Sequence, residues 1–337
     1  MSFKWSIIIC CYNSVKRIDS ALLCIFNQDY LQHAPIELVI VDNNSSDNLK
    51  EHISKLNIPD SVSINYVFES EPGLSAARKS GVLASSGDYI CWIDDDNDIA
   101  HDYLNVANEI FSSENKICFI GGKSDWPNSY KMSDLPKFVT RFAKAVAVGK
   151  QRQYTEGFIE LGDFLWGAGL CMRRSVVLGL YKSGFQPILT GRLGESILSG
   201  EDGELTILLQ LSGGLGYYSD RLYLEHRVDK FRFTYSYFTK LFFGMGLAYP
   251  TLRYYRRQIR INDQNQFLLQ SKKIFKQTKD SEKNQNQTPL ANHYFLIFFG
   301  IFFISGIAKG WIKGLHSDVP NNVQMVLNYY KSFNKDT

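Results

Sequence analysis

Short apolar runs alternate with segments of helical periodicity over the first 125 residues. The apolar runs have the length of buried strands and are Ser6–Cys11, Ile36–Val41, Ile64–Phe68 and Tyr89–Ile93. Between them, apolar residues recur at helical spacing, as in Leu49, Ile53 and Leu56. This alternation predicts βαβ units and a mostly parallel α/β sheet, whose ligands bind beyond the carboxyl ends of the strands.

The pattern changes in the second half of the chain. It weakens over Trp126–Glu160, returns as a strand over Phe164–Met172, and reads as a helix over Glu201–Leu211. Residues 1–228 are therefore predicted to form one α/β domain. Residues 229–337 are rich in aromatic and basic residues and are predicted to form a helical extension, with a polar linker at about 262–292.

Polar residues follow three of the predicted strands. Asn13 follows the first, a polar run beginning at Asp42 follows the second, and Asp94, Asp95 and Asp96 end the fourth. Adjacent carboxylates repel one another unless a positive group neutralises them, and a divalent cation with a diphosphate suits that role. Oxygen ligands favour Mg2+ or Mn2+. The alternative is an acidic, solvated turn.

These segments resemble a known family in their order and spacing. The matching stretches are Ile7-Ile8-Ile9-Cys10-Cys11-Tyr12-Asn13, Val39-Ile40-Val41-Asp42-Asn43-Asn44-Ser45-Ser46-Asp47 and Trp92-Ile93-Asp94-Asp95-Asp96. They are similar to the motifs of family-2 glycosyltransferases, over about residues 5–230. The resemblance implies a GT-A fold, in which helices flank a Rossmann-like, mixed and mostly parallel sheet. It also implies transfer of a sugar from a nucleotide sugar with inversion.

The resemblance assigns a donor site. It implies that Asp42 contacts the base or ribose, with Tyr12 and Asn13 lining the same pocket, although turn chemistry also accounts for an Asp there. It places Arg78, in Pro72–Arg78, over the nucleotide, but Lys79 stands where the family often has Asn. It assigns Asp94 to the ribose, Asp95 to support and Asp96 to the metal.

The resemblance also assigns an acceptor side. Asp202, in Ser199–Leu205, is implied to be the base that deprotonates the acceptor hydroxyl, with Glu201 beside it. Acidic residues are also favoured at any helix start, which is the structural alternative. Trp166 and Gly167 are implied to lie along the donor sugar and acceptor, although a bent strand would also contain such glycines.

Two further segments have weaker support. His226 lies where many GT-A enzymes complete the metal shell with a histidine, and imidazole suits manganese, but a single His is as often structural. Thr190–Gly194 is predicted to be a mobile loop with glycine hinges that orders over the substrates.

Charge and cysteine content narrow the function classes. A formal charge of +3 gives no reason to expect nucleic-acid binding. The six cysteines lack CxxC spacing, which argues against zinc and a disulfide framework and fits a reducing cytoplasm. No cleaved export signal is expected at the N-terminus.

The C-terminal third suggests a membrane. Tyr294–Ala308 is almost wholly apolar but shorter than the roughly 20 residues that span a bilayer. Upstream lie the aromatic segment Phe231–Tyr249 and four arginines that suit anionic headgroups: Arg253, Arg256, Arg257 and Arg260. We expect a peripheral, monotopic or single-span protein at the cytoplasmic face of the cell membrane. The alternative is a buried core helix followed by a solvated basic helix.

The sequence thus predicts an inverting transferase that builds cell-surface polysaccharide or another glycan. The donor is a nucleotide sugar, with UDP favoured over dTDP or GDP, and the acceptor is a glycan or lipid-linked hydroxyl. The cofactor is Mn2+ or Mg2+. The alternative from another class is a catalytically idle sugar-nucleotide-binding or assembly protein at a membrane. A dehydrogenase or nucleotidyltransferase is disfavoured because no glycine-rich loop follows the first strand.

Overall fold

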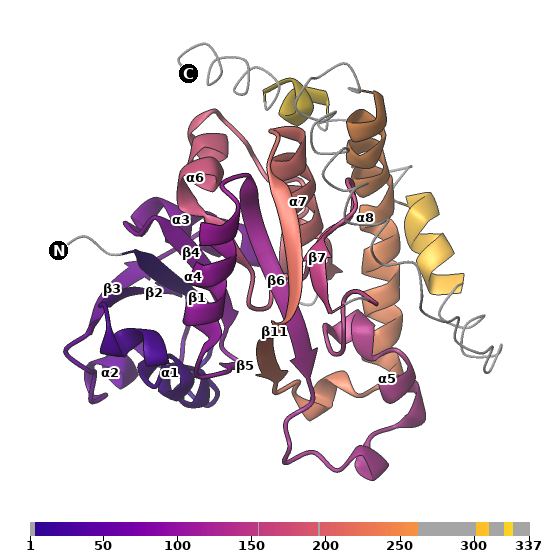
Figure 1. Cartoon of the computed structure of the whole chain (residues 1–337). Coiled ribbons are helices and arrows are strands. Elements are labelled where there is room, and N and C mark those ends of the chain that lie inside the picture. Colours follow the sequence, from indigo (N-terminus) through magenta and orange to yellow (C-terminus); the bar gives the residue numbers. More distant parts are fainter. Residues whose placement is uncertain (1–3, 154, 195, 262–300, 310–319, 326–337) are drawn as a thin grey trace.

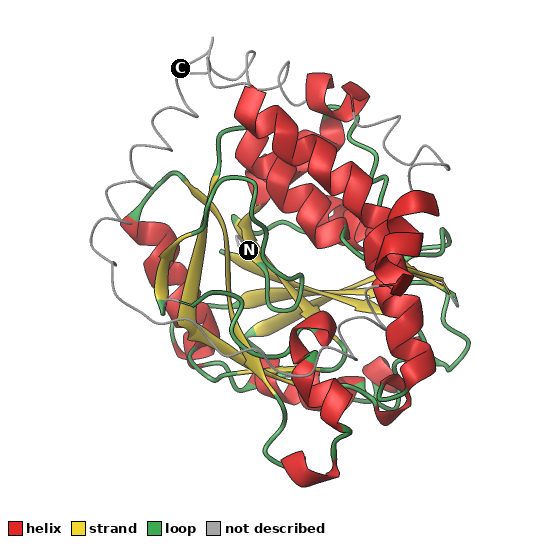
Figure 2. Ribbon diagram, turned by 90° about the vertical axis from the view of Figure 1, so that its right-hand side faces the viewer, coloured by secondary structure: helices red, strands yellow, loops and turns green. Residues whose placement is uncertain are grey.

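A computed structural model describes residues 4–153, 155–194, 196–261, 301–309 and 320–325. Its main sheet has the order β3-β2-β1-β4-β8-β6-β11-β5, with β7 paired to β11. Strands β3, β2, β1 and β4 are parallel to one another, as are β6 and β11, whereas β8, β5 and β7 are antiparallel to their neighbours. Helices lie on both faces of this sheet (Figure 2). The predicted mixed, mostly parallel α/β sheet is confirmed.

The first half of the chain consists of βαβ units. The four predicted strands are present as β1 (Trp5–Cys11), β2 (Ile36–Asp42), β3 (Val62–Phe68) and β4 (Tyr89–Asp94). They alternate with α1 (Ile18–Phe26), a 3-10 turn (Asp29–Gln32), α2 (Leu49–Ser54) and α3 (Leu74–Ala84). Parallel neighbours bring the carboxyl ends of these strands to one edge of the sheet, where their polar residues meet.

The second half extends the sheet and covers it. The strands are β5 (Asn97–Ile99), β6 (Ile117–Asp125), β7 (Glu156–Phe158), β8 (Cys171–Arg173) and β11 (Leu215–His226). The helices are α4 (Tyr103–Ser113), α6 (Arg174–Lys182) and α7 (Glu201–Leu211). The predicted bounds of the helix Glu201–Leu211 are confirmed.

The strand predicted over Phe164–Met172 is wrong for most of its length. Only Cys171–Arg173 is a strand, and residues 164–170 are irregular. Gly169 has φ of 72°, which breaks an extended backbone, and its carbonyl accepts a hydrogen bond from the Tyr103 hydroxyl at 2.6 Å. The run is apolar because it is buried beside β4, so apolarity alone does not distinguish a strand from an irregular buried segment.

The stretch from Trp126 to Glu160 is as irregular as expected. Besides β7, its described residues contain only α5 (Lys137–Arg141) and two 3-10 turns (Met132–Asp134 and Ala143–Val146). Residues 190–194 are only partly a loop, and their mobility stays a prediction. They enter a two-stranded antiparallel hairpin of β9 (Gly191–Leu193) and β10 (Ser196–Leu198), and β10 packs against α8 (Tyr235–Ile261).

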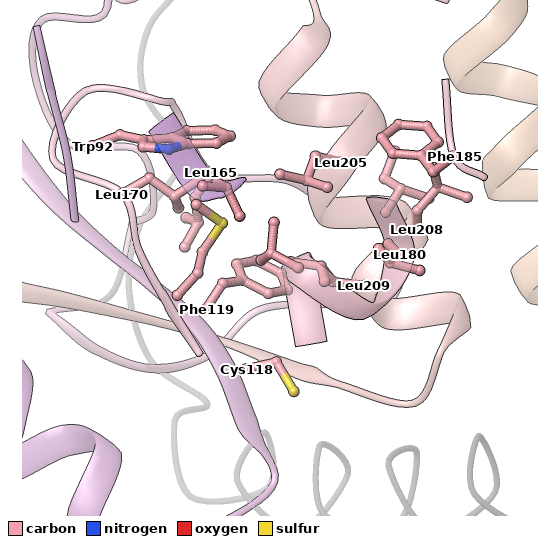
Figure 3. Close-up of a cluster of buried hydrophobic side chains, with 14 of the residues drawn as sticks. Trp92, Cys118, Phe119, Leu165, Leu170, Leu180, Phe185, Leu205, Leu208 and Leu209 are labelled. Carbon is pink, nitrogen blue, oxygen red and sulfur yellow. The ribbon is translucent and has the colours of Figure 1, made fainter. Parts of the chain in front are cut away.

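Alternate residues of the central strands pack into two separate hydrophobic cores, one on each face of the sheet. On β1, Ile8 packs into the core on one face of the sheet, whereas Ile7 and Ile9 pack into the core on the other. This alternation follows from the two-residue repeat of a strand. Figure 3 shows the first core, in which Trp92 and Phe119 from the sheet meet leucines such as Leu205. Because α7 contributes to this core, its first turn is held rigidly above the sheet edge.

Helix α8 is the long helix at the right of Figure 1, preceded by a 3-10 turn (Lys230–Arg232), and it packs against α7. A second helix, residues 301–309, lies beside it. The two backbones approach so closely that a Cβ on Gly246 would lie 2.1 Å from the Phe303 carbonyl oxygen, and one on Gly306 would lie 2.1 Å from that of Phe243. Only glycine fits at such a crossing.

Among the described helices, none combines the length and apolarity needed to cross a bilayer. The predicted linker at about 262–292 and the first part of Tyr294–Ala308 lie outside the described residues. The proposed division into residues 1–228 and 229–337 stays a prediction.

A buried carboxylate ties α7 to its surroundings and makes stability depend on pH. Glu204 accepts hydrogen bonds from the backbone N–H of Leu189 and the hydroxyl of Tyr255, both at 2.8 Å. Burial raises the pKa of Glu204 from 4.5 to about 7. The folded protein therefore binds more protons than the unfolded chain between these values, and the contribution of Glu204 to stability falls as pH rises from 4.5 to 7.

Replacing Glu204 by Gln should remove this pH dependence, since an amide does not ionise. The unfolding free energy of Glu204→Gln minus that of the wild type should rise by roughly 3 kcal/mol from pH 4.5 to pH 8, on top of a constant loss from weaker hydrogen bonding. Urea unfolding at both pH values measures the difference. An equal difference at the two values would contradict the prediction.

Candidate functional site

The polar strand ends open into one cavity of about 950 Å3. The sequence-predicted site residues that line it are Tyr12, Asn13, Arg78, Asp94, Asp95, Asp96, Trp166, Gly167, Glu201, Asp202 and His226. Asp42 is not among the lining residues. Residues as distant in sequence as Tyr12 and His226 therefore face one space.

The Asp42 side chain, at the end of β2, is hydrogen-bonded to other residues of the protein. Its carboxylate accepts hydrogen bonds from the Tyr66 hydroxyl at 2.7 Å and the Ser45 N–H at 2.8 Å. Asn13, with φ of 52°, accepts a hydrogen bond from the Ser46 N–H at 2.8 Å. These contacts join the loops after β1 and β2 into one wall. They match the turn chemistry considered for Asp42, whose contact with the donor stays a prediction.

Each carboxylate of the acidic cluster has its own arginine. Arg78 lies 3.6 Å from Asp94 (Nη2 to Oδ1), and Arg17 lies 2.6 Å from Asp95 (Nη2 to Oδ2). The third carboxylate, Asp96, has Arg232 Nη1 at 3.3 Å from its Oδ2. Protein cations thus neutralise the cluster, so the need for a counter-charge does not by itself require a metal.

Asp95 and Asp96 respond to their neighbours in opposite ways. Burial and the adjacent Asp96 raise the pKa of Asp95, against the effect of Arg17. Burial opposes the charge on Asp96 too, but His226 and Arg232 more than offset it and hold the pKa of Asp96 well below its usual range. Asp96 is therefore the carboxylate most strongly held in its ionised form.

Asp96 and His226 fit two positions of a metal shell. Their facing atoms, Oδ1 and Nε2, are 3.4 Å apart, and both side chains are buried at the cavity wall. One carboxylate oxygen and one imidazole nitrogen suit Mn2+ or Mg2+. Among the described residues no cluster of three metal-ligating side chains occurs.

Arg78 connects the two sides of the cavity. The side chain is 4% exposed, and its Nη1 lies 3.3 Å from Glu201 Oε1 on α7, opposite Asp94 on β4. The guanidinium also lies over the Trp92 ring at 4.4 Å. A Cβ on Gly167 would lie 2.4 Å from Arg78 Nη2, which explains the glycine at that position.

Asp202 is held by backbone donors at the start of α7. It accepts hydrogen bonds from the Gly167 N–H at 2.9 Å and the Gly203 N–H at 2.7 Å. Burial, followed by the charge of Glu201, raises the pKa of Asp202 from 3.8 to about 7. A carboxylate with this pKa accepts a proton readily near neutral pH.

The cavity wall formed by α8 is largely apolar. Leu241, Met245, Ala248 and Leu252 line the cavity at helical spacing along one face of α8, and Phe303 joins them from residues 301–309. The first turn of α7 rests on this face, since a Cβ on Gly200 would lie 3.2 Å from Leu252 and 3.3 Å from Ala248. The cavity therefore combines acidic and basic side chains with an apolar wall, and the helix turn that carries Asp202 rests on that wall.

Sequence reasoning missed two of the arginines at the cluster, Arg17 and Arg232. The requirement for a counter-charge was visible in the sequence, because three adjacent carboxylates need one. Neither the motifs nor the spacing indicated which arginines supply it, since Arg17 precedes α1 and Arg232 follows β11.

Comparisons with known proteins agree with this geometry. A model described as Glycosyl transferase family 2 matches residues 6–166. The glucosyl-dolichyl phosphate glucuronosyltransferase of Haloferax volcanii is 21% identical over 328 residues, which cover 96% of this chain and all of that protein. In three other curated glycosyltransferases the aligned stretch spans only 34%, 38% and 14% of their length.

Two solved structures share the fold. TarS 1-349 of S. aureus in complex with UDP-GlcNAc has a TM-score of 0.50 at 15% identity and covers 99% of this chain and 93% of its own. The mannosyltransferase PcManGT of Pyrobaculum calidifontis, in complex with GDP-Man and Mn2+, has a TM-score of 0.50 at 14% identity and covers 98% and 74%. The chain has the GT-A fold, and just under half of it, residues 6–166, matches glycosyl transferase family 2.

Proposed function

We propose that the protein transfers a sugar, with inversion, from a nucleoside-diphosphate sugar to a hydroxyl of a lipid-linked acceptor at the cytoplasmic face of a membrane, in the synthesis of a cell-surface glycan. The observation that carries the proposal is the position of Asp202, which shares one cavity with the acidic cluster and is joined to it through Glu201 and Arg78. UDP is the first candidate for the nucleotide, followed by dTDP and GDP.

The donor's diphosphate is proposed to lie among the acidic and basic side chains, with Asp96 and His226 holding a divalent cation. A bound cation neutralises the diphosphate and makes it a better leaving group. PcManGT is in complex with Mn2+ and GDP-Man, which supports the same chemistry here. Tyr12, Asn13, Asp42, Asp94 and Asp95 are proposed to hold or support the nucleoside side of the donor.

Asp202 is proposed to be the base. The acceptor hydroxyl gives its proton to Asp202 as its oxygen bonds to the anomeric carbon, while the bond from that carbon to the diphosphate breaks. Attack from the side opposite the leaving group inverts the configuration. Glu201 keeps Arg78 in place, and Trp166 and Gly167 border the sugar and acceptor.

An acceptor with an apolar part suits the apolar wall of the cavity. The α8 face from Leu241 to Leu252 lines the cavity with hydrocarbon, where a purely saccharide acceptor would leave its hydroxyls without partners. The Haloferax volcanii relative is named for a dolichyl phosphate substrate, which supports this choice.

Membrane attachment is proposed to use the outer faces of the same helices. Ile301 and Ile304 are 57% and 65% exposed. Arg253, Arg257 and Arg260 form an exposed basic stripe on α8, which suits anionic headgroups. Together they favour a surface that docks on a bilayer.

The second candidate, a catalytically idle sugar-nucleotide-binding protein, would use the donor site alone. The raised pKa of Asp202 favours the enzyme, because a carboxylate tuned toward neutrality costs stability that binding alone does not require.

Replacing Asp202 by Asn should lower kcat by about 10²- to 10⁴-fold, because the base is lost. The amide oxygen of Asn can keep one of the two hydrogen bonds from the Gly167 and Gly203 N–H groups, whereas its NH2 cannot accept the other. Release of the nucleoside diphosphate in the presence of Mn2+ and membrane lipid measures kcat. Asp134→Asn, at an exposed carboxylate on a remote turn, is the matched control. Wild-type activity in Asp202→Asn would eliminate Asp202 as the base.

The rate should also depend on pH through Asp202. The base must be ionised, so kcat/KM should rise about tenfold per pH unit below pH 7 and level off above it. A pH profile from 5 to 9 measures this limb. A flat profile would mean that a group other than Asp202 takes the proton.

Nucleotide binding identifies the donor class. Among UDP, GDP, dTDP and ADP, one should raise the melting temperature clearly more than the rest, and the rise should be larger with Mn2+ because a cation held by Asp96 and His226 would neutralise the diphosphate. A thermal-shift panel with and without Mn2+ measures it. The donor-site assignment fails if none of the four stabilises the protein in either condition.

A further inference from the structure

Arg232 occupies an unusual position beside the proposed metal ligands. It ends the 3-10 turn Lys230–Arg232, which follows β11 and His226. Its guanidinium approaches one oxygen of Asp96 at 3.3 Å while His226 approaches the other at 3.4 Å. The two side chains of the ion pair, Arg232 and Asp96, are 9% and 5% exposed. Arg232 thus forms an ion pair with the carboxylate that is proposed to bind the cation.

The attachment of Arg232 is weak compared with that of its neighbour. Arg227 donates from Nε to Asp98 at 2.8 Å and from Nη2 to two backbone carbonyls, at 3.0 and 3.1 Å. The Nε of Arg232 is buried, and within the described part of the chain it has no hydrogen-bond partner. A buried donor without a hydrogen-bond partner destabilises the folded protein. An acceptor that reached the Arg232 guanidinium would remove this cost.

The cavity offers a ligand that supplies such acceptors. Arg232 is one of the cavity-lining residues, and the neighbouring Arg192 lines the same region. A diphosphate offers pairs of oxygens that can accept two hydrogen bonds from the planar donor fork of an arginine. A cation arriving at Asp96 would meanwhile repel the guanidinium beside it, because two positive groups would share one carboxylate.

We infer that Arg232 is a built-in counter-ion of Asp96 that the divalent cation displaces, and that the displaced guanidinium then binds the diphosphate of the donor. The inference rests on the proposed function, since it requires a diphosphate ligand and a cation at Asp96. In the free protein Arg232 keeps the buried carboxylate neutralised. In the loaded protein the cation takes over that task and Arg232 becomes a donor-binding residue.

Displacement of Arg232 would couple the binding of the cation to the binding of the diphosphate. The cation alone must compete with Arg232, whereas the cation and diphosphate together give Arg232 a new partner. Each ligand therefore increases the affinity for the other, and the effect is reciprocal. Removing the guanidinium should change the two affinities in opposite directions, which mere damage to the site would not do.

The test compares the wild type with Arg232→Met, Arg232→Lys and the control Lys230→Met, which removes an exposed charge two residues away. Mn2+ binding without nucleotide is measured from the electron paramagnetic resonance signal of the free ion. Pyrophosphate binding to the Mn2+-saturated proteins is measured by calorimetry. Circular dichroism checks that each variant is folded.

Arg232→Met should bind Mn2+ alone roughly 5- to 50-fold more tightly than the wild type and should bind pyrophosphate more weakly by a similar factor. Arg232→Lys should fall between the two, and Lys230→Met should match the wild type. Unchanged or weaker Mn2+ binding in Arg232→Met would overturn the competition, and unchanged pyrophosphate binding would overturn the role in donor binding.

The outcome also separates this inference from the proposed function. If the wild type binds Mn2+ and pyrophosphate and Arg232→Met behaves like Lys230→Met, only the role of Arg232 fails. If the wild type binds neither ligand, the donor site itself fails, and the inference fails with it.

Discussion

The arrangement of the site depends on one buried cation. Arg78 lies between Asp94 at the end of β4 and Glu201 at the start of α7, and the Trp92 ring packs against it. A buried guanidinium is costly to desolvate and must keep its partners, so it fixes the separation of the two elements that carry them. The end of β4 and the first turn of α7, which face the cavity from two sides, are therefore positioned by the two ion pairs of one buried side chain and not by loop packing alone.

Arginines also neutralise the carboxylates of the acidic cluster. A sequence with three consecutive carboxylates indicates that cations are needed, and the fold supplies one arginine for each. Such a site is held together before any ligand arrives, which is the preorganisation that electrostatic catalysis requires. A metal joining this site would enter an existing set of ion pairs and would have to rearrange part of it.

Sequence reasoning succeeded where local pattern and strand topology determine the outcome. The four parallel strands follow from apolar runs, and the meeting of Asn13 and Asp96 follows from the rule that strand ends share one edge, whereas Asp202 was placed by the family resemblance. It failed where the outcome depends on long-range packing. The irregular backbone around Gly169 and the partners of Arg17 and Arg232 arise from tertiary contacts with residues distant in sequence, which no local pattern encodes. The role of each site residue stays a prediction, because position alone does not establish chemistry.

The glycine crossing between α8 and residues 301–309 makes this late segment part of the cavity wall. Gly246 and Gly306 bring the two backbones together, and that contact seats Phe303 in the cavity wall. A chain truncated after Ile261 would retain every candidate catalytic side chain and yet lack part of the surface that lines the cavity. The limits of the matched family model, residues 6–166, are therefore a poor guide to where the working enzyme can be cut.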